Sequence, residues 1–396
     1  MKKIILIAIA LLWTANSLLQ ARTQEEASAI ASQFIGQRVA TIGSAKRVAA
    51  ASKITLAFTQ NQIDQTTPAL FIFNSGTDDG FVMVSAEDEG RTILGYSDDG
   101  HFDETNIPTN MQFWLQMYAD ELARYNANKQ PGKPALKRAA VQTSYPTITP
   151  ILGNVEWGQG EPYNNLCPTV NGERCVTGCV ATAISQIMYV HKHPTKGTGS
   201  HSYTSETHQL TSSANFSATT YDWSNMLPVY TRNNYNTTQA NAVATLMHHV
   251  GIVAEMDYDP EGSGANSSYT LSQMATYFGY DAGIRTLPKD YMREEEVMTA
   301  IISDLEQGHP VFVSGRTKND EGHAFVCDGM QSDGYLHINW GWYGGANGYF
   351  ALSALDPEQQ GTGGSASDMA FTEEVNVYTG IQPDQGGTAQ PLETLK

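Results

Sequence analysis

The chain has 396 residues, 41% of them hydrophobic and 10% aromatic, and a formal net charge of −18 at neutral pH. This length exceeds what one ordinary hydrophobic core supports, so it predicts two domains, and the aromatic content indicates that they are packed and globular. The strong negative charge argues against nucleic acid or an anionic membrane surface as a partner. With 4 cysteines, the chain has too few for a small fold held together by disulfides.

The N-terminus has the layout of a secretory signal. Lys2 and Lys3 precede an apolar run that ends at Trp13, and small and polar residues follow as far as Ala21. The apolar run is too short for a membrane span, so we predict a signal peptide over residues 1–21 that is removed. The mature protein is therefore expected in the extracellular medium, in the periplasm or at the cell surface, without a membrane anchor.

Residues 22–140 form the first expected domain, which mixes helix and strand. A helix is predicted over 23–35 because apolar residues recur on one face, and an amphipathic helix is predicted after Pro108. Between them lie short strand-like runs, separated by Asn, Asp and Gly turns. These runs are Ile54–Phe58, Leu70–Phe73, Phe81–Val84 and Ile93–Tyr96. This order of elements predicts a compact α+β domain.

A basic, proline-bearing stretch over residues 129–140 ends the first domain. It shows no apolar periodicity and contains Lys129, Pro131, Lys133, Pro134, Lys137 and Arg138. Such a composition is typical of an exposed linker that proteases reach easily. A plain tether between two domains has the same composition, so cleavage there needs support from other observations.

Residues 141–381 form the second expected domain, which is helical first and then rich in strands. Helices are predicted from Cys179 onward and near 240–252, 270–278 and 294–308. The last third contains aromatic and β-branched runs joined by Gly, Asn and Asp turns, as in an antiparallel meander. These runs are Val311–Ser314, His323–Asp328, Tyr335–Trp340 and Tyr349–Leu352. The polar residues 382–396 are predicted to be disordered, and the fold class is α+β.

Cys179 lies where the predicted helix begins. Thr177 and Gly178 suit a helix entrance, and apolar residues recur every three or four positions beyond them. Unpaired backbone N–H groups and the helix dipole favour a thiolate in the first turn, which predicts a lowered pKa and a nucleophile at neutral pH. Cysteine is also among the most buried residue types, and this stretch alone fits a structural core cysteine equally well.

A cysteine nucleophile requires a base within hydrogen-bond reach, and His323 is the best candidate among 10 histidines. It begins a predicted strand next to Gly322, at the edge of the expected sheet. It lies 144 positions after Cys179, within the range for papain-like pairs. The spacing alone is weak evidence, so the partners of the histidine matter.

The predicted hairpin suggests two residues that would orient His323. If residues 323–328 and 335–340 pair around a turn at Gln331, Asn339 faces His323, whereas a one-residue bulge puts Trp340 there. The asparagine would act through its amide oxygen, and the tryptophan by covering the ring. An ordinary hairpin with a packed tryptophan is the alternative.

Thiolate attack on a carbonyl builds an oxyanion, which preorganised hydrogen-bond donors stabilise. The backbone N–H of Cys179 is one donor at the start of the helix. Gln159, in the glycine-rich stretch 157–165, is the predicted second donor, although an ordinary loop glutamine fits the sequence as well.

The remaining cysteines carry no predicted catalytic role. Cys167 and Cys175 would close a short loop by a disulfide in an oxidising compartment, or remain as free thiols. Their spacing with Cys179 lacks the paired knuckles of a zinc site, and we expect neither a metal nor an organic cofactor. Cys327 occupies an apolar strand position and is predicted to be inert.

Several sequence blocks contain these candidate residues in a fixed order. The blocks are Trp157-Gly-Gln-Gly-Glu-Pro-Tyr-Asn164, Thr177-Gly-Cys-Val-Ala-Thr-Ala-Ile-Ser-Gln-Ile-Met188, Gly322-His-Ala-Phe-Val-Cys-Asp-Gly329, His337-Ile-Asn-Trp-Gly-Trp342 and Gly361-Thr-Gly-Gly364. With them the chain resembles the streptopain family of secreted papain-like cysteine proteases over nearly everything after the signal. Ordered blocks are far more specific than any one of them.

The resemblance implies a role for each matching residue. Cys179 matches the nucleophile, His323 the general base and acid, and Gln159 the oxyanion-hole glutamine. Trp340 matches the tryptophan beside the catalytic histidine. Gly322 and Trp340 would form part of the wall of a pocket that prefers a bulky apolar P2 side chain.

The resemblance also implies an architecture. The catalytic domain would be papain-like, with a helical part that carries the cysteine and an antiparallel sheet that carries the histidine. The N-terminal domain would be an inhibitory propeptide that docks on the catalytic domain and displaces the histidine. Activation would cut the basic stretch between Lys129 and Val141.

We therefore predict a secreted cysteine endopeptidase that is made as a zymogen and acts on proteins and peptides. A papain-like acyltransferase, such as a transglutaminase-like enzyme, is one alternative, and a host-binding scaffold without turnover is another. The inhibitory domain and the linker favour proteolysis over acyl transfer. The complete set of Cys179, His323 and Gln159 argues against a scaffold without catalysis.

Overall fold

The structure is a computed structural model of the chain and describes residues 21–42, 54–88, 90–128, 144–316, 322–354 and 374–388. The predicted signal peptide as far as residue 20, the basic linker 129–140, the block 361–364 and the end of the polar tail lie outside these residues. Among the described helices, none has the length and apolar character needed to cross a membrane.

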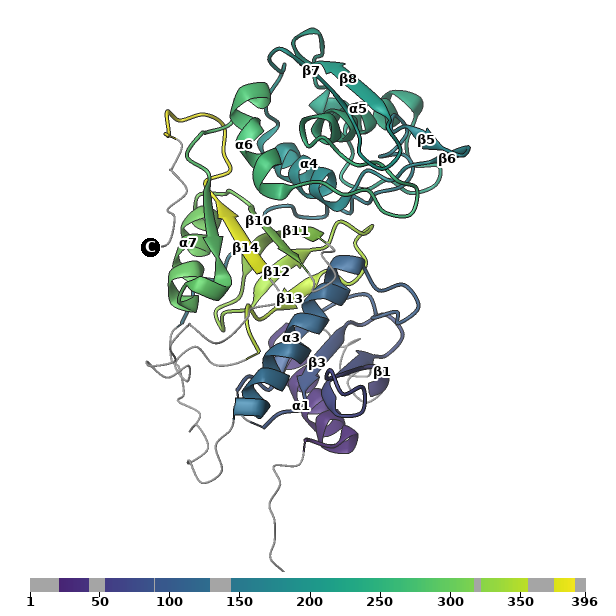
Figure 1. The fold of residues 1–396 in the computed structure, drawn as a ribbon. Helices are drawn as coiled ribbons and strands as arrows, with labels where there is room; N and C mark the ends of the chain where they lie inside the picture. The colour runs from purple at the N-terminus through teal and green to yellow at the C-terminus, as the bar shows by residue number, and fades with distance from the viewer. Residues whose placement is uncertain are drawn as a thin grey trace, which may run out of the picture.

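The N-terminal part is an antiparallel sheet between two helices (Figure 1). Its elements are α1 (Gln24–Ile42), β1 (Ile54–Asn61), β2 (Pro68–Ser75), β3 (Phe81–Ser85), β4 (Ile93–Ser97) and α3 (Thr109–Asn128). Side chains alternate between the two faces of a strand, so Phe71 and Phe73 pack with α1 while Leu70 and Ile72 pack with α3. The predicted α+β character of this part is confirmed.

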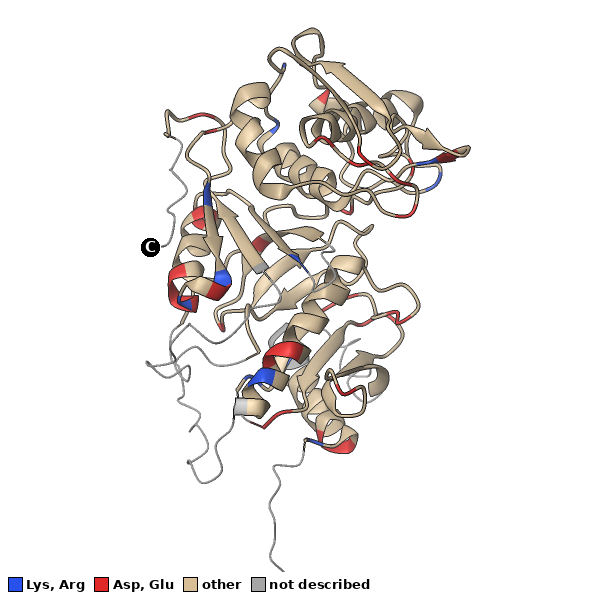
Figure 2. Cartoon of the chain, in the orientation of Figure 1, with Lys and Arg blue, Asp and Glu red and all other residues tan. Residues whose placement is uncertain are grey.

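A helical region follows, with α4 (Cys179–His191), α5 (Thr237–Val253) and α6 (Ser267–Phe278). Helix α4 contains no Asp, Glu, Lys or Arg and is drawn without charge in Figure 2. It packs between α5 and the strand β11 (Gly322–Met330). The region also holds the short hairpins β5 (Thr169–Val170) with β6 (Glu173–Arg174) and β7 (Ser200–Thr204) with β8 (Thr211–Asn215), and the turns η1 (Phe216–Ala218) and η2 (Trp223–Asn225).

The last part of the chain is an antiparallel sheet. The predicted meander is confirmed, because β10 (Val311–Arg316), β11, β12 (Leu336–Asn339) and β13 (Gly348–Phe350) pair in order. The strands β9 (Arg285–Pro288) and β14 (Glu374–Thr379), at the other edge, were not predicted. Helix α7 (Glu294–Glu306), preceded by η3 (Lys289–Tyr291), covers this sheet.

The sheet of the N-terminal part and the sheet of the last part are joined into one continuous sheet. Within the described residues the order of the ten-stranded sheet is β1-β2-β3-β4-β13-β12-β11-β10-β14-β9, so β4 of the N-terminal part pairs with β13. The pairing brings Gly95 against Phe350, and a Cβ at Gly95 would lie 2.5 Å from the Phe350 ring. A Cβ at Gly348 would lie 2.5 Å from the Tyr96 carbonyl oxygen. Glycine at both positions permits the close approach of the two strands.

The predicted register of the β11–β12 hairpin is wrong. Asn339 pairs with Val326, three positions further along β11 than His323. The turn is centred later than predicted, because the Gln331 N–H donates to the Tyr335 carbonyl, and a register shift follows Cys327. On its other side His323 pairs with Gly315 of β10.

Residues 382–388, which were predicted to be disordered, are ordered. The Gln382 carbonyl accepts a hydrogen bond from the Asp281 N–H, and the Gln385 and Gly387 N–H groups donate to the Asp281 carboxylate. A Cβ at Gly387 would clash with this carboxylate at 1.7 Å. The buried Asp281 thus fixes the first residues of the tail against the end of α6.

Candidate active site

Cys179 is the first residue of α4, as predicted. Gly178 precedes it with φ 82, and a Cβ there would lie 2.8 Å from both the Met256 sulfur and the Ser263 carbonyl oxygen. The Thr182 hydroxyl donates to the Gly178 carbonyl at 2.9 Å. A tight, glycine-dependent turn therefore sets the entrance of the helix and the position of the thiol.

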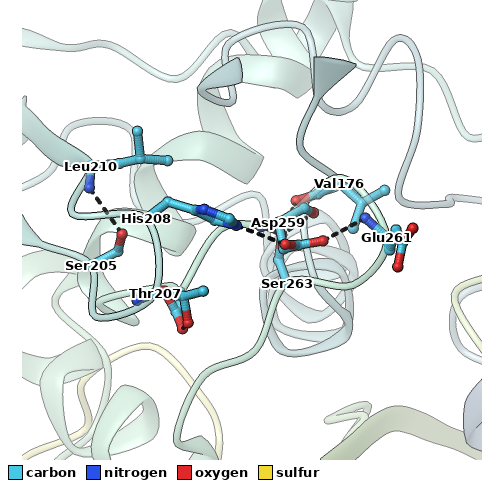
Figure 3. Close-up of polar contacts among 9 residues, drawn as sticks. Val176, Ser205, Thr207, His208, Leu210, Asp259, Glu261 and Ser263 are labelled. Carbon is cyan, nitrogen blue, oxygen red and sulfur yellow. Dashed lines mark hydrogen bonds and ion pairs between the residues drawn. The ribbon is translucent and has the colours of Figure 1, made fainter. Parts of the chain in front are cut away.

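A chain of hydrogen bonds supports the segment that leads to Cys179 (Figure 3). The Ser263 hydroxyl donates to the Val176 carbonyl at 2.7 Å and accepts from the Asp259 N–H at 3.0 Å. His208, in the β7–β8 turn, donates from Nε2 to the Asp259 carboxylate at 2.8 Å, which lowers the pKa of Asp259. The N–H of Glu261 also donates to this carboxylate. The loop 257–264 is thus braced on both sides.

The Cys179 thiol is half-buried against β11. Its Sγ lies 4.0 Å from the carbonyl oxygen of Gly322. Burial raises the pKa of Cys179, and the backbone N–H groups of Ala324, Val180 and Cys179 lower it by less. The prediction of a lowered pKa is wrong for this arrangement, because desolvation of the thiolate outweighs the donors at the helix start.

The side chain of His323 lies on the face of β11 that packs against the N-terminal part. Alternate residues of the strand face opposite sides: Ala324 packs in the core around α4, and Phe325 in the core around α3. By this alternation His323 shares the face of Phe325. Its ring lies against Phe113 of α3, with ring centroids 5.7 Å apart at an interplanar angle of 35°.

Helix α3 also binds the backbone on both sides of this site. The amide of Asn110, in the first turn of α3, donates to the Ala324 carbonyl at 3.1 Å and to the Trp340 carbonyl at 2.5 Å. Asn110 is buried. Further along α3, the Glu121 carboxylate accepts from the Ser353 hydroxyl at 2.6 Å. The N-terminal part therefore covers the strand that carries His323.

Gln159 lies close to the segment that precedes Cys179. The Thr177 N–H donates to the Gln159 carbonyl at 3.0 Å. Trp157, two residues earlier, is fully buried, and its indole donates to the Leu227 carbonyl at 2.8 Å. The structure thus brings the backbone of Gln159 to the segment before α4, and the donor role of its side chain stays a prediction.

Trp340 and Asn339 are both buried. Trp340 packs against Phe325 and Trp114, with ring centroids 4.9 and 6.2 Å apart. The Asn339 amide donates to the Val155 carbonyl and accepts from the Gly341 N–H. Both ends of this amide therefore have backbone partners, and the orienting role that rested on a facing His323 loses its basis.

The other cysteines are free thiols. Cys167 and Cys175 lie at the base of the β5–β6 hairpin, where the Cys175 N–H donates to the Pro168 carbonyl. Burial raises the pKa of Cys167 to about 12 and also raises the pKa of Cys175 and Cys327. The pKa is raised for all four cysteines, so exposure and not pKa distinguishes them: Cys167, Cys175 and Cys327 are buried, whereas Cys179 is half-buried.

Comparison with known proteins decides the family. The model of the Peptidase C10 family matches residues 157–350, and that of the Spi protease inhibitor matches residues 20–122. Streptopain of Streptococcus pyogenes is 32% identical over 381 residues, which cover 92% of this chain and 92% of streptopain. The chain belongs to the peptidase C10 family.

Other relatives of the C10 family agree. The structure of a prointerpain A fragment of Prevotella intermedia is 32% identical, with a TM-score of 0.69, and covers 83% of this chain and 99% of the fragment. Active interpain A is 35% identical, with a TM-score of 0.51, over 59% of this chain and 95% of its own. The thiol protease/hemagglutinin PrtT of Porphyromonas gingivalis is 32% identical over 91% of this chain, which spans only 42% of PrtT.

This C10 chain is a cysteine-type peptidase made as a proenzyme. Its catalytic domain follows an N-terminal Spi-type inhibitor domain, the propeptide, whose α3 lies on the strand of His323. The family resemblance and the α+β fold class predicted from the sequence are confirmed. Asn110 and Phe113 were not predicted as contacts of the site. Their signal was the start of an amphipathic helix after Pro108, which does not reveal what that helix touches.

Proposed function

We propose that this chain is the zymogen of a secreted cysteine endopeptidase in which Cys179 is the nucleophile and His323 the general base and acid. The observation that carries the proposal is the position of α3. Phe113 contacts the ring of His323, and Asn110 binds the Ala324 backbone, while the Cys179 thiol lies against the backbone of Gly322. Such an arrangement, with the proposed base held away from the proposed nucleophile, is expected of a site that its propeptide keeps inactive.

In the active enzyme, the proposed reaction has two halves. His323 takes the thiol proton, and the thiolate sulfur attacks the carbonyl carbon of the scissile peptide bond. The resulting oxyanion accepts hydrogen bonds from the Cys179 N–H and the Gln159 side-chain amide. His323 then protonates the leaving amine, the carbon–nitrogen bond breaks, and an acyl-enzyme remains. A water molecule, deprotonated by His323, hydrolyses the thioester and restores the thiol.

Removal of the propeptide is the proposed activating event. Without α3, His323 no longer contacts Phe113, and we propose that the start of β11 rearranges so that the imidazole comes to the side on which Cys179 lies. Ionisation of Cys179 as an ion pair with His323 would then offset the burial that raises its pKa in the zymogen. We propose that the cut falls in the basic linker between Lys129 and Val141 and that the enzyme makes it itself.

The remaining roles follow the family resemblance. We propose that Gly322, which has open space around its Cα, and Trp340 form part of the wall of a P2 pocket for a bulky apolar side chain. Residues 1–21 are proposed as the export signal, which would place the mature enzyme outside the cytoplasm. No metal or organic cofactor takes part in this proposal.

Casein cleavage tests the function in three forms whose propeptide an added protease has removed: the natural chain, Cys179→Ala and His323→Ala. We expect both variants to lose at least about a thousandfold in kcat/KM, because they remove the nucleophile and the base. Cys179→Ala should also persist at full length unless another protease is added. Activity retained in Cys179→Ala, or its spontaneous maturation at the normal rate, would refute the proposal. Incorporation of a fluorescent amine faster than hydrolysis would identify an acyltransferase instead.

A further inference from the structure

We infer that Tyr343 is a positioning residue that holds the Gly158–Gly160 loop, and with it the side chain of Gln159, in place beside the nucleophile. The inference rests on the proposed role of Gln159 as an oxyanion donor. Tyr343 comes shortly after β12, directly behind Trp342, and is far from the loop in sequence.

The ring of Tyr343 lies directly on the backbone of Gly158. A Cβ at Gly158 would lie 2.5, 2.5 and 2.6 Å from three of the ring carbons, so no side chain fits there beside the tyrosine. Gly158 is not among the residues with positive φ, and backbone conformation therefore does not require a glycine. The close approach of the tyrosine ring is the reason for glycine at this position.

Tyr343 forms hydrogen bonds with residues on either side of Gln159 in the loop. The Gly160 N–H donates to the Tyr343 hydroxyl at 2.7 Å, and the Tyr343 N–H donates to the Trp157 carbonyl at 3.1 Å. A Cβ at Gly160 would lie 2.5 Å from the same hydroxyl. Main chain and side chain of one residue thus hold the loop on both sides of Gln159.

Tyr343 adopts a conformation that an L side chain rarely takes. Its φ is 54, in the left-handed region that favours glycine, and its side chain is 45% exposed. A tyrosine kept at such a site, with much of its surface in water, must be held by specific contacts rather than by burial. The contacts to Gly158 and Gly160 are of this kind.

The loop held by Tyr343 also touches the segment that leads to the nucleophile. The Gln159 carbonyl accepts from the Thr177 N–H at 3.0 Å, two residues before Cys179. This bond fixes the loop on one side only. Without Tyr343, the loop would keep this bond, the Trp157 indole bond to Leu227 and the Asn164 N–H bond to the Gly160 carbonyl. Gln159 would nevertheless lose the contacts on both its neighbours, and preorganisation of the oxyanion donor would weaken.

The test compares two reactions of Cys179 in the matured enzyme. Hydrolysis of a peptide amide builds an oxyanion, whereas alkylation by iodoacetamide is a direct displacement that builds none. We expect Tyr343→Gly, which keeps a residue suited to positive φ, to lower kcat about 10- to 100-fold, since losing an oxyanion donor costs about 100-fold or more. KM and the alkylation rate should change less than about twofold. Tyr343→Phe should fall between.

Controls separate this inference from the role of Gln159. Tyr291→Phe, at an exposed tyrosine of η3, should leave both rates unchanged. Gln159→Ala combined with Tyr343→Gly should be no slower than Gln159→Ala alone.

If Gln159→Ala is slow but Tyr343→Gly has normal kcat, the inference on Tyr343 is wrong and the oxyanion role stands. If Gln159→Ala is itself unimpaired, the oxyanion role fails. Equal loss of alkylation and hydrolysis in Tyr343→Gly and Tyr343→Phe would show a general structural role and overturn the inference.

Discussion

Phe113 of the propeptide and His323 of the catalytic domain lie ring against ring, with centroids 5.7 Å apart. Beside them, Asn110 donates two hydrogen bonds to catalytic-domain carbonyls. The propeptide thus contacts the proposed base directly on one face of β11, while Cys179 lies on the other face of the same strand.

Asn110→Ala and Phe113→Ala are expected to weaken inhibition. Two buried carbonyls would lose a donor, at about 1–3 kcal/mol each, and the ring pair contributes about 1 kcal/mol beyond burial. We predict that either variant matures about tenfold faster or more in a time course followed by gel electrophoresis. Gln112→Ala, at an exposed position of the same helix, serves as the control. Maturation at the natural rate in both variants would show that these contacts do not restrain the enzyme.

The stability of the zymogen should be sensitive to added side-chain volume between β4 and β13. Gly95→Ala would place a Cβ 2.5 Å from the Phe350 ring, and overpacking of this kind costs about 1–3 kcal/mol. We predict a lower midpoint of thermal unfolding for the Cys179→Ala zymogen that carries Gly95→Ala. Gly36→Ala, in open space on α1, should leave the midpoint equal or higher, because alanine favours helix. A midpoint unchanged by Gly95→Ala would argue against the shared sheet.

Much of this fold followed from periodicity. The helix that starts at Cys179 and the meander that contains His323 were predicted, because apolar spacing and turn residues are local signals. The pairing of Gly95 with Phe350 was not predictable, since it joins strands about 250 positions apart and no local pattern specifies a partner of this kind.

For the site, too, local signals were visible in the sequence and contacts between distant segments were not. Cys179, His323 and Gln159 stand out by residue type and motif. Asn339 was misplaced because a hairpin register depends on the turn, and here the turn is centred beyond Gln331. The pKa of Cys179 was predicted in the wrong direction, because the helix start is visible in the sequence and the desolvation by β11 is not.

The Ser263 hydroxyl supports the segment before Cys179, and removing this hydroxyl should lower the stability of the chain. Ser263→Ala would leave the Val176 carbonyl without its side-chain donor, at a cost of about 1–3 kcal/mol. We predict a lower urea midpoint with an unchanged slope, together with a reduced alkylation rate at Cys179. Ser272→Ala, at an exposed serine of α6, is the matched control. Equal urea midpoints for the two variants would contradict the bracing role.

Glu294 makes the stability of the zymogen depend on pH. Burial raises the pKa of Glu294 from 4.5 to about 7, Glu121 of the propeptide adds to the effect, and Lys289 and Arg91 oppose it. In Figure 2, acidic and basic positions are present on α3 and also at α7. A carboxyl with a raised folded-state pKa favours its neutral form, so its stabilising contribution is full below about pH 4.5 and is lost as the pH rises through about 7.

Glu294→Gln tests this dependence because it keeps the shape and removes the charge. Thermal unfolding of the Cys179→Ala zymogen between pH 5 and 8 should show a fall in midpoint with rising pH. The fall should be shallower in Glu294→Gln and unchanged in the control Glu295→Gln, at an exposed neighbour. Parallel curves for the natural chain and Glu294→Gln would exclude this residue as the source.

Cys179 is proposed to be the nucleophile of this peptidase. The most direct measurement is to incubate the matured chain with an epoxysuccinyl inhibitor, digest it and locate the adduct by mass spectrometry, with casein cleavage measured in parallel. We expect one adduct, on Cys179, formed in proportion to the loss of casein cleavage. An adduct on Cys167, Cys175 or Cys327 that accompanies the loss of cleavage, with Cys179 unmodified, would contradict it.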